Sequence, residues 1–250
     1  EPIDREEMVQ SLLNAGERLA PYVREAEAVV REAVARGEDV LFEGAQGALL
    51  DVQHGTYPFV TSSSTNAGAV ATGVGIAPSA IDGVVGIVKA YTTRVGAGPF
   101  PSELEGPVAD HLRSVGHEFG STTGRPRRCG WLDLPALRYA HGLNGFTSFA
   151  LTKLDVLTGL PEIKLCVGYR IDGAVVDVPP SAANMESIEP VYEVFPGWTE
   201  DIKGVQSLEE LPESARRYVE AVESLVGVPV AVLGTGPGRK EIVERSALWV

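Results

Sequence analysis

A short segment, "TKLD" from Thr152 to Asp155, follows the apolar run "SFAL" and offers an ammonium and a carboxylate where a strand is expected to end. Guanine presents two adjacent N–H donors, and one carboxylate such as Asp155 accepts both, as carboxylates do with arginine. Adenine presents an acceptor at the ring position, so the same carboxylate disfavours it. The stem of Lys153 can cover a flat base while its ammonium stays in water. Taken alone, two solvated charges at the end of a core strand explain this short pattern equally well.

A second segment, "GSTTGRPRRCGWLD" at residues 120–133, carries three arginines without an acidic neighbour in the sequence. Gly120 and Gly124 bracket three hydroxyl residues, which lets backbone N–H groups form an anion-binding concavity. Hydroxyls, amides and guanidinium groups together suit phosphate or carboxylate ligands. The alternative is a solvated basic loop that balances acidic neighbours, but such a loop does not require this framing by glycine and hydroxyl residues.

Two further polar segments are weaker indications. The run Thr61–Asn66 precedes an expected helix, and a helix N-terminus binds anions readily, although a hydroxyl-rich N-cap explains the run equally well. The segment "EGAQG" places Glu43 and Gln46 at the end of another expected strand, where a buried glutamine is more often structural. A hydrolase built on Glu43 and Asp51 is a further alternative, but no substrate logic in the sequence supports it.

These polar segments need a scaffold that brings strand ends together. Short apolar runs predict strands at residues 83–95, 148–152 and 228–236, and a short buried strand that enters a Gly-rich turn within residues 40–47. A hairpin is expected over residues 162–178, with its turn at Asp172-Gly173. Apolar spacing predicts two helices before residue 37, with Pro21 early in the second, and further helices at residues 66–78, 107–118, 133–143 and 208–226. Alternating strands and helices predict an α/β fold: a mostly parallel central sheet with helices on both faces, plus a small antiparallel hairpin element.

The expected organisation is one α/β unit over residues 1–250, with a helical lead-in at 1–38 and a core with ligand-binding loops at 39–250. In parallel sheets, ligands bind at the edge where the strands end. Three segments follow expected strands at that edge: "EGAQG", "TKLD" and "GTGPGR". Their coincidence is the main functional signal that comes from the residues alone.

Composition narrows the class of protein. The net charge of −13 argues against nucleic acid as a partner, and no apolar run approaches the roughly 18 residues that cross a bilayer. Two isolated cysteines fit a reducing cytoplasm better than a disulfide framework. The phosphate-loop pattern G-x-x-x-x-G-K-[ST] is absent. Because the sequence starts without Met and enters a helix at once, we interpret it as a piece of something longer.

Six segments together resemble one family. They are "FEGAQGALLDVQHGTYPFVTSSSTNAGAVATG", "GIVKAYTTRVGAGPFPSEL", "GSTTGRPRRCGWLDLPALR", "LTKLDVL", "KLCVGYR" and "GTGPGR", and they occur in the order and spacing of adenylosuccinate synthetase, from about Asp39 to the C-terminus. The resemblance implies a GTP-dependent ligase that joins IMP to L-aspartate and yields adenylosuccinate, GDP and phosphate through 6-phosphoryl-IMP. The alternative is a guanine-nucleotide-binding module without chemistry. The cluster from Ser121 to Arg128 distinguishes the two, because such a module has no need for a second anion site.

The resemblance also implies roles for residues, carried over by motif. GTP contacts are expected from Arg127, Lys153, Leu154, Asp155, Gly234, Thr235 and Gly236. IMP contacts are expected from Gln46, Thr61 and Arg125, with Gln46 near the phosphorylated oxygen and both Gln46 and Arg125 as catalytic contacts. The aspartate carboxylates are expected at Ser121, Thr122, Thr123, Gly124, Arg125, Pro126 and Arg127. Gly234 replaces a frequent Ser of the family, and Pro126 replaces a common Arg.

The family's other catalytic parts are expected in an N-terminal region that these 250 residues do not contain. They are the catalytic Asp, the general-acid His, the Lys of the phosphate loop and the ligands of Mg²⁺. The resemblance therefore implies that the fragment carries no metal ligands of its own and does not turn over alone. Full-length members are expected to form homodimers.

Overall fold

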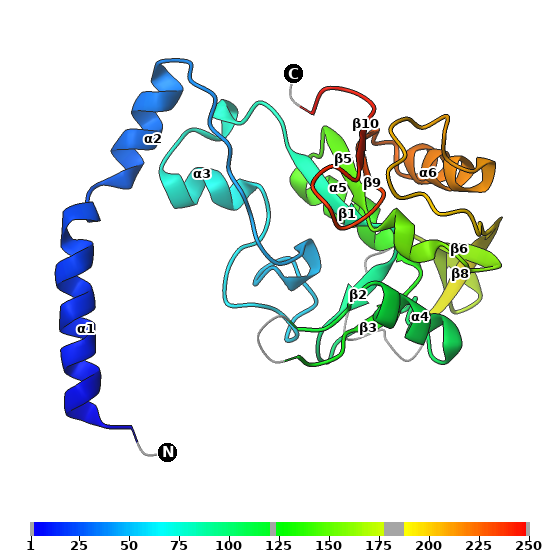
Figure 1. Cartoon of the computed structure of the whole chain (residues 1–250), viewed down its shortest axis with the longest axis horizontal. Helices are drawn as coiled ribbons and strands as arrows, with labels where there is room; N and C mark the ends of the chain where they lie inside the picture. The colour runs from blue at the N-terminus through cyan, green and yellow to red at the C-terminus, as the bar shows by residue number, and fades with distance from the viewer. Residues whose placement is uncertain (1–2, 121–123, 178–187, 249–250) are drawn as a thin grey trace. The chain divides into compact units, whose positions relative to one another are not determined.

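The computed structural model describes residues 3–120, 124–177 and 188–248 (Figure 1). These residues belong to two compact units, one made of Glu1–Glu43 with Val70–Ala80 and the other of Gly44–Ala69 with Ile81–Val250. The expectation of a single α/β unit with a helical lead-in stays a prediction.

The first unit is helical. It contains α1 (Arg5–Leu19), the 3₁₀ turn η1 (Ala20–Tyr22), α2 (Ala26–Ala35), most of α3 (Gly68–Val74) and the 3₁₀ turn η3 (Pro78–Ala80). The Asp4 carboxylate caps α1 by accepting the backbone N–H groups of Glu6 and Glu7 at 2.9 and 3.1 Å. Pro21 lies in the turn between α1 and α2, so its predicted place inside the second helix is wrong. Extended backbone at Val23 ends the turn before α2 begins.

The second unit is built on a mostly parallel sheet, which confirms the predicted fold class. The sheet has the order β1 (Val85–Lys89), β5 (Ser148–Thr152), β9 (Val230–Gly234) and β10 (Ile242–Glu244). The first three strands are parallel, and β10 is antiparallel to β9. Strands β5 and β9 are buried along almost their whole length, as is typical of central parallel strands with near-continuous apolar sequence.

Two smaller sheets complete the strands of this unit. Strands β2 (Thr92–Arg94) and β3 (Arg128–Gly130) form an antiparallel pair. In the other sheet β6 (Glu162–Ile171) pairs with β4 (Leu132–Asp133) in parallel and with β7 (Ala174–Val176) and β8 (Glu189–Pro196) in antiparallel fashion. The predicted hairpin is confirmed: Asp172 and Gly173 both have positive φ angles, 50° and 82°, as a two-residue type I′ turn requires.

The helices of this unit are α4 (Pro107–Val115), α5 (Leu134–Asn144) and α6 (Glu213–Val226), with 3₁₀ turns η2 (Ala48–Leu50) and η4 (Leu154–Leu157). The helix predicted at 107–118 ends three residues early, because His117 adopts a positive φ that no helix continues. The helix predicted from 208 begins only at Glu213, after Pro212 at its N-cap. Among the residues that the structure describes, no helix is long and apolar enough to cross a membrane.

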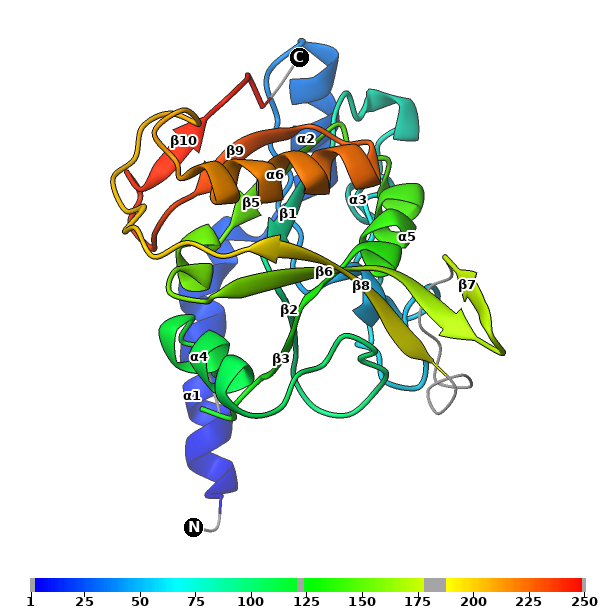
Figure 2. The same cartoon turned by 90° about the vertical axis from the view of Figure 1, so that its right-hand side faces the viewer.

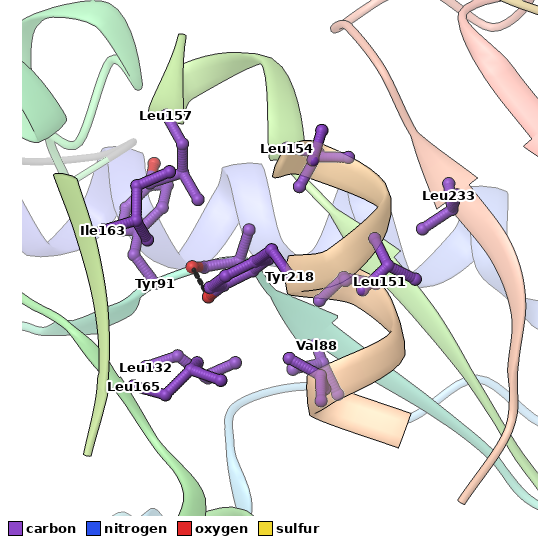
Figure 3. Close-up of a cluster of buried hydrophobic side chains, with 14 of the residues drawn as sticks. Val88, Tyr91, Leu132, Leu151, Leu154, Leu157, Ile163, Leu165, Tyr218 and Leu233 are labelled. Carbon is purple, nitrogen blue, oxygen red and sulfur yellow. Dashed lines mark hydrogen bonds between the residues drawn. The ribbon is translucent and has the colours of Figure 1, made fainter. Parts of the chain in front are cut away.

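The core of this unit lies between α6 and the parallel sheet (Figure 2). Val88, Leu151 and Leu233 are register partners on three neighbouring strands and form an apolar row with Tyr218 of α6 (Figure 3). The Tyr218 hydroxyl donates to the Ala90 carbonyl oxygen at 2.7 Å. Burying each such side chain contributes about 1.5–3 kcal/mol. This row therefore holds the three strands in register, so that their carboxyl ends lie at the same edge of the sheet.

Two predicted strands are wrong in detail. Residues 40–47 form no strand within the described chain, and Leu41 is 74% exposed, because an apolar run becomes a strand only where a neighbour supplies backbone hydrogen bonds. The run at 83–95 is divided between β1 and β2, which belong to different sheets. The division falls at the buried residues Ala90 and Tyr91.

Candidate functional site

The loops after β5 and β9 lie against each other at the carboxyl edge of the parallel sheet. Both strands run in the same direction, and they end at Thr152 and Gly234. A Cβ atom at Gly234 would lie 3.2 Å from the Cα of Thr152 and 3.6 Å from the backbone nitrogen of Lys153. Glycine therefore allows the "GTG" loop to approach the "TKLD" loop closely. The predicted meeting of these two segments is confirmed.

The Asp155 carboxyl group lies half-buried in η4, directly after the turn that Lys153 makes with a φ of 61°. Burial raises the pKa of Asp155; its own backbone N–H and the ammonium groups of Lys203 and Lys153 oppose this rise, and Glu241 adds to it. A carboxylate that loses hydration without full compensation is stabilised when a ligand brings N–H donors to it.

The hydroxyl of Thr235 is a second sign of a ligand site at this edge. Thr235 is fully buried at the end of β9, and within the described part of the chain its Oγ1 has no hydrogen-bond partner. Its backbone N–H donates to the Glu241 carbonyl oxygen at 2.9 Å, which holds the loop in place. Buried hydroxyls normally have a partner, so this one favours a ligand group nearby.

A fully buried carboxylate, Glu118, lies at the centre of the polar contacts. It accepts hydrogen bonds from the Lys89 ammonium at 2.9 and 3.0 Å, from the Tyr91 hydroxyl at 2.6 Å and from the Arg127 guanidinium at 2.7 Å. The Lys153 ammonium lies 3.3 Å from the same carboxylate and donates to the Gly116 carbonyl oxygen. One carboxylate thus joins the lysine of the "TKLD" segment to an arginine of the second predicted segment.

Electrostatics keep Glu118 ionised. Burial alone would raise its pKa, but the hydrogen bonds from Tyr91 and Lys89 and the positive charges around it lower the pKa to about 2. Lys89 responds in the opposite sense: burial lowers its pKa despite the neighbouring carboxylate. Three cations face one carboxylate, so the cluster retains excess positive charge that favours anions.

The arginine-rich loop is closed at its base by backbone pairing. The Arg127 N–H donates to the Glu118 carbonyl oxygen at 2.9 Å, and the Gly120 N–H donates to the Arg125 carbonyl oxygen at 2.8 Å. Phe119 and Pro126 form an antiparallel bridge between these contacts. Gly124 has a φ of 66°, a conformation that favours glycine. The predicted aspartate contacts Ser121, Thr122 and Thr123 lie outside the described residues.

The absence of acidic neighbours for these arginines holds in the sequence but not in space. Arg127 pairs with Glu118, and Arg128 forms a two-pronged ion pair with Glu103, in which Nε donates to Oε1 at 2.7 Å. Arg128 therefore points to a structural partner, whereas Arg127 shares its partner with Lys153.

The loop that carries Gln46 and Thr61 is organised by the buried Asp51. Its carboxylate accepts the N–H groups of Gln53 and His54 at 2.9 and 3.0 Å, the N–H of Thr65 at 2.7 Å and the Asn66 amide at 2.8 Å. Burial alone would raise the pKa of Asp51, but these hydrogen bonds hold it well below its usual range. All four contacts are structural, which removes Asp51 as a hydrolytic group.

The predicted IMP contacts sit on this organised loop. Gln46 has a φ of 64°, and the next carbonyl oxygen, that of Gly47, accepts the Thr65 hydroxyl at 3.0 Å. The Thr61 N–H donates to the Leu50 carbonyl oxygen at 2.8 Å. Gln46 therefore follows no strand, contrary to expectation, and its position is fixed by loop contacts instead.

Replacing Asp51 with Asn is expected to lower the free energy of unfolding by about 1–3 kcal/mol at pH 7, because the Asn amide group faces N–H donors that then stay unpaired. The folded pKa lies below the unfolded value of about 3.9, so the parent's advantage is present above that pH and is lost as the pH falls through the folded pKa. Urea unfolding at several pH values measures this. Asp82→Asn, at an exposed position, is the matched control and should change little.

Arg94 connects this loop to the arginine-bearing strand pair. Its guanidinium donates to the Thr56 hydroxyl and the Phe59 carbonyl oxygen, both at 2.9 Å. Arg94 itself lies opposite Arg128 in the register of β2 and β3. Contacts therefore run from the Thr61 loop through β2 and β3 to Arg127, and from there through Glu118 to Lys153.

Sequence reasoning missed Glu118 and Lys89. Lys89 is the last residue of β1 and the register partner of Thr152, so the rule that singled out "TKLD" also points to it. Glu118 gave no signal, because it was expected inside a helix. For the expected Mg²⁺, the described residues offer no group of three His, Cys, Asp or Glu side chains that could hold a metal ion. The expected position of the Mg²⁺ ligands in the full-length protein stays a prediction.

This geometry defines the class as an α/β protein in which the loops after β5 and β9 meet at the carboxyl edge of a mostly parallel sheet, with a cation-rich cluster around Glu118. A sequence model of adenylosuccinate synthetase matches residues 1–243, and the chain belongs to that family.

Curated relatives named adenylosuccinate synthetase agree with this assignment. One from Halothermothrix orenii is 52% identical over 98% of this chain, and one from Desulforudis audaxviator is 54% identical over 95%. The alignments cover 58% and 56% of those relatives, so the chain spans little more than half their length. A solved structure of fully ligated adenylosuccinate synthetase from Plasmodium falciparum superposes with a TM-score of 0.95 at 42% identity, covering 98% of this chain and 59% of that one.

Proposed function

We propose that this chain supplies the guanine site, the aspartate site and part of the IMP site of a GTP-dependent ligase that joins IMP to L-aspartate. The observation that carries the proposal is the convergence of Lys153 and Arg127 on Glu118, with the half-buried Asp155 two residues after Lys153. A base site and an anion site that share one carboxylate suit a reaction between a guanine nucleotide and an anionic second substrate.

The chemistry explains why a nucleoside triphosphate is needed. The oxo group at C6 of IMP is a poor leaving group. A base removes the N1 proton, O6 attacks the γ-phosphorus of GTP, and GDP leaves to give 6-phosphoryl-IMP. The amine of L-aspartate then attacks C6 and loses a proton. The C6–O6 bond breaks, phosphate leaves with O6, and adenylosuccinate is formed. The resemblance assigns the base and the general acid to residues beyond these 250.

This chain's own residues would bind and orient the reactants. Asp155 accepts the two guanine N–H groups, Leu154 and the loop of Gly234, Thr235 and Gly236 border the base, and the buried Thr235 hydroxyl finds its partner there. Gln46 donates its amide toward the oxygen that is phosphorylated, where negative charge develops.

Thr61 and Arg125 contact IMP, the nucleotide that is phosphorylated. The loop from Ser121 to Arg127, including Gly124 and Pro126, receives the carboxylates of L-aspartate, and Arg127 also lies toward GTP.

The wider context is part of the same proposal. Cys129 and Cys166 are both buried free thiols, which suits a reducing cytoplasm. By family resemblance the full-length protein requires Mg²⁺ and acts as a homodimer. Neither nucleic acid nor a membrane is needed for the reaction.

A reconstitution assay tests the proposal. The 250 residues by themselves are expected to form no adenylosuccinate from IMP, L-aspartate and GTP. When the family's N-terminal region is supplied, adenylosuccinate should appear with GTP and not with ATP, as followed by ultraviolet absorbance and chromatography. Turnover by the 250-residue chain alone, or equal rates with ATP, contradicts the proposal.

A further inference from the structure

We infer that Glu118 is a positioning residue that couples the guanine loop, Thr152–Asp155, to the arginine-rich loop that carries Arg127. Through this coupling, GTP and L-aspartate bind cooperatively. The inference rests on the proposed function and adds to it a mechanism of communication between the two sites. It is carried by how the donors are distributed over the two oxygens of one buried carboxylate.

The two oxygens of Glu118 serve different loops. Oε1 accepts the Tyr91 hydroxyl at 2.6 Å and faces the Lys153 ammonium at 3.3 Å, while Oε2 accepts the Arg127 guanidinium at 2.7 Å. Lys89 donates to both oxygens, at 2.9 and 3.0 Å, from the end of β1. Tyr91 and Lys89 therefore hold the carboxylate in one orientation. In that orientation Oε1 faces Lys153 and Oε2 faces Arg127, so each oxygen contacts a cation from a different loop.

Burial makes the cations compete for this carboxylate. Glu118 is fully buried, and an unpaired charge is costly in that position, so its interactions with the surrounding cations strengthen when one of them is withdrawn. An L-aspartate carboxylate that draws Arg127 away leaves Glu118 to Lys89 and Lys153. Lys153 is then held more firmly, and its stem is fixed over the guanine base.

The sign of the coupling follows from this competition. L-Aspartate strengthens the hold on Lys153 and thereby tightens GTP binding, and by linkage GTP tightens L-aspartate binding by the same factor. Without Glu118 the two loops have no shared charge. A purely structural ion pair would instead contribute to stability and leave the two affinities independent.

The test measures linkage by calorimetry on the 250-residue chain, titrating GTP with and without saturating L-aspartate. The parent chain should bind GTP at least about fivefold more tightly with L-aspartate, within the usual range of coupling factors. In Glu118→Gln the factor should fall to about one. Glu118→Asp keeps the charge but is one methylene shorter and cannot span both loops, so it should also lose most of the coupling while preserving the fold.

Glu103→Gln is the matched control, because it makes the same chemical change in a partly buried ion pair with Arg128, the residue next to Arg127. It should keep the parent coupling factor. A parent factor of one, or an undiminished factor in folded Glu118→Gln and Glu118→Asp, overturns the inference. Absence of any preference for GTP over ATP in the parent chain defeats the proposed function instead, so the two failures are distinguishable.

Discussion

Replacing Asp155 with Asn is expected to abolish the preference of this chain for GTP over ATP. The carboxylate offers two acceptor oxygens to the two adjacent N–H donors of guanine, whereas Asn offers one acceptor and turns an NH₂ donor toward the second guanine donor. The unpaired donor costs about 1–3 kcal/mol, which corresponds to a roughly 5- to 150-fold loss of GTP affinity. Adenine presents an acceptor at the ring position, so the new NH₂ group should improve ATP binding at the same time.

Calorimetry of GTP and ATP with parent and variant chains measures the ratio directly. Asp172→Asn is the matched control, because it makes the same chemical change in the type I′ hairpin turn, where Asn-Gly is as well suited as Asp-Gly. The control should keep both affinities. A GTP-to-ATP ratio that Asp155→Asn leaves unchanged would rule out base recognition by this carboxylate.

The parts of the site that the sequence predicted are those that depend on local chemistry. The apolar run of β5 ends at Thr152, and the run of β9 ends at Gly234; parallel strands put both ends at one edge without further information. The Asp172-Gly173 turn was equally predictable, because few residue pairs accept two positive φ angles.

The parts that the sequence did not predict depend on partners that are distant along the chain. Residues 40–47 have a strand-like composition, but composition does not reveal whether a neighbouring strand is present to pair with. Glu118 takes its donors from β1, from the arginine-rich loop and from the turn after β5, and no local pattern announces that meeting. The same holds for Arg128, whose partner Glu103 pairs with it only once β3 is in place.

Asp51 and Glu118, both fully buried in this unit, use their carboxylates in different ways. Asp51 is satisfied entirely by neutral N–H groups of its own loop, so it fixes backbone and leaves nothing for a ligand. Glu118 is satisfied mostly by cations from separate elements, which ligand anions can compete for. Burial alone therefore does not separate structural from functional carboxylates, whereas the charge and origin of their donors do.

A side chain at Gly130 is expected to cause a large loss of stability, because it would meet backbone atoms. Gly130 ends β3, where it pairs with Thr92 and forms a bridge to Glu103. A Cβ atom would lie 2.2 Å from the carbonyl oxygen of Ser102 and 2.7 Å from its carbonyl carbon. The segments around Gly130 and Ser102 cannot separate freely, because two hydrogen bonds join them. The Ser102 hydroxyl donates to the Trp131 carbonyl oxygen at 2.8 Å, and the Trp131 N–H donates to the Ser102 carbonyl oxygen at 3.1 Å.

Gly130→Ala is therefore expected to lower the free energy of unfolding by about 3 kcal/mol or more, and the melting temperature by roughly 10 °C for a chain of this size. Because Arg128 begins the same strand and Arg127 directly precedes it, the displacement should also weaken L-aspartate binding. Gly142→Ala is the matched control: no heavy atom lies within 4 Å of the added Cβ inside α5, and removing a helix glycine should raise stability by roughly 0.5–1 kcal/mol. Thermal unfolding followed by circular dichroism measures both variants. Equal stabilities for the two variants would mean that β3 is free to move away from Ser102, which would contradict a rigid placement of Arg127.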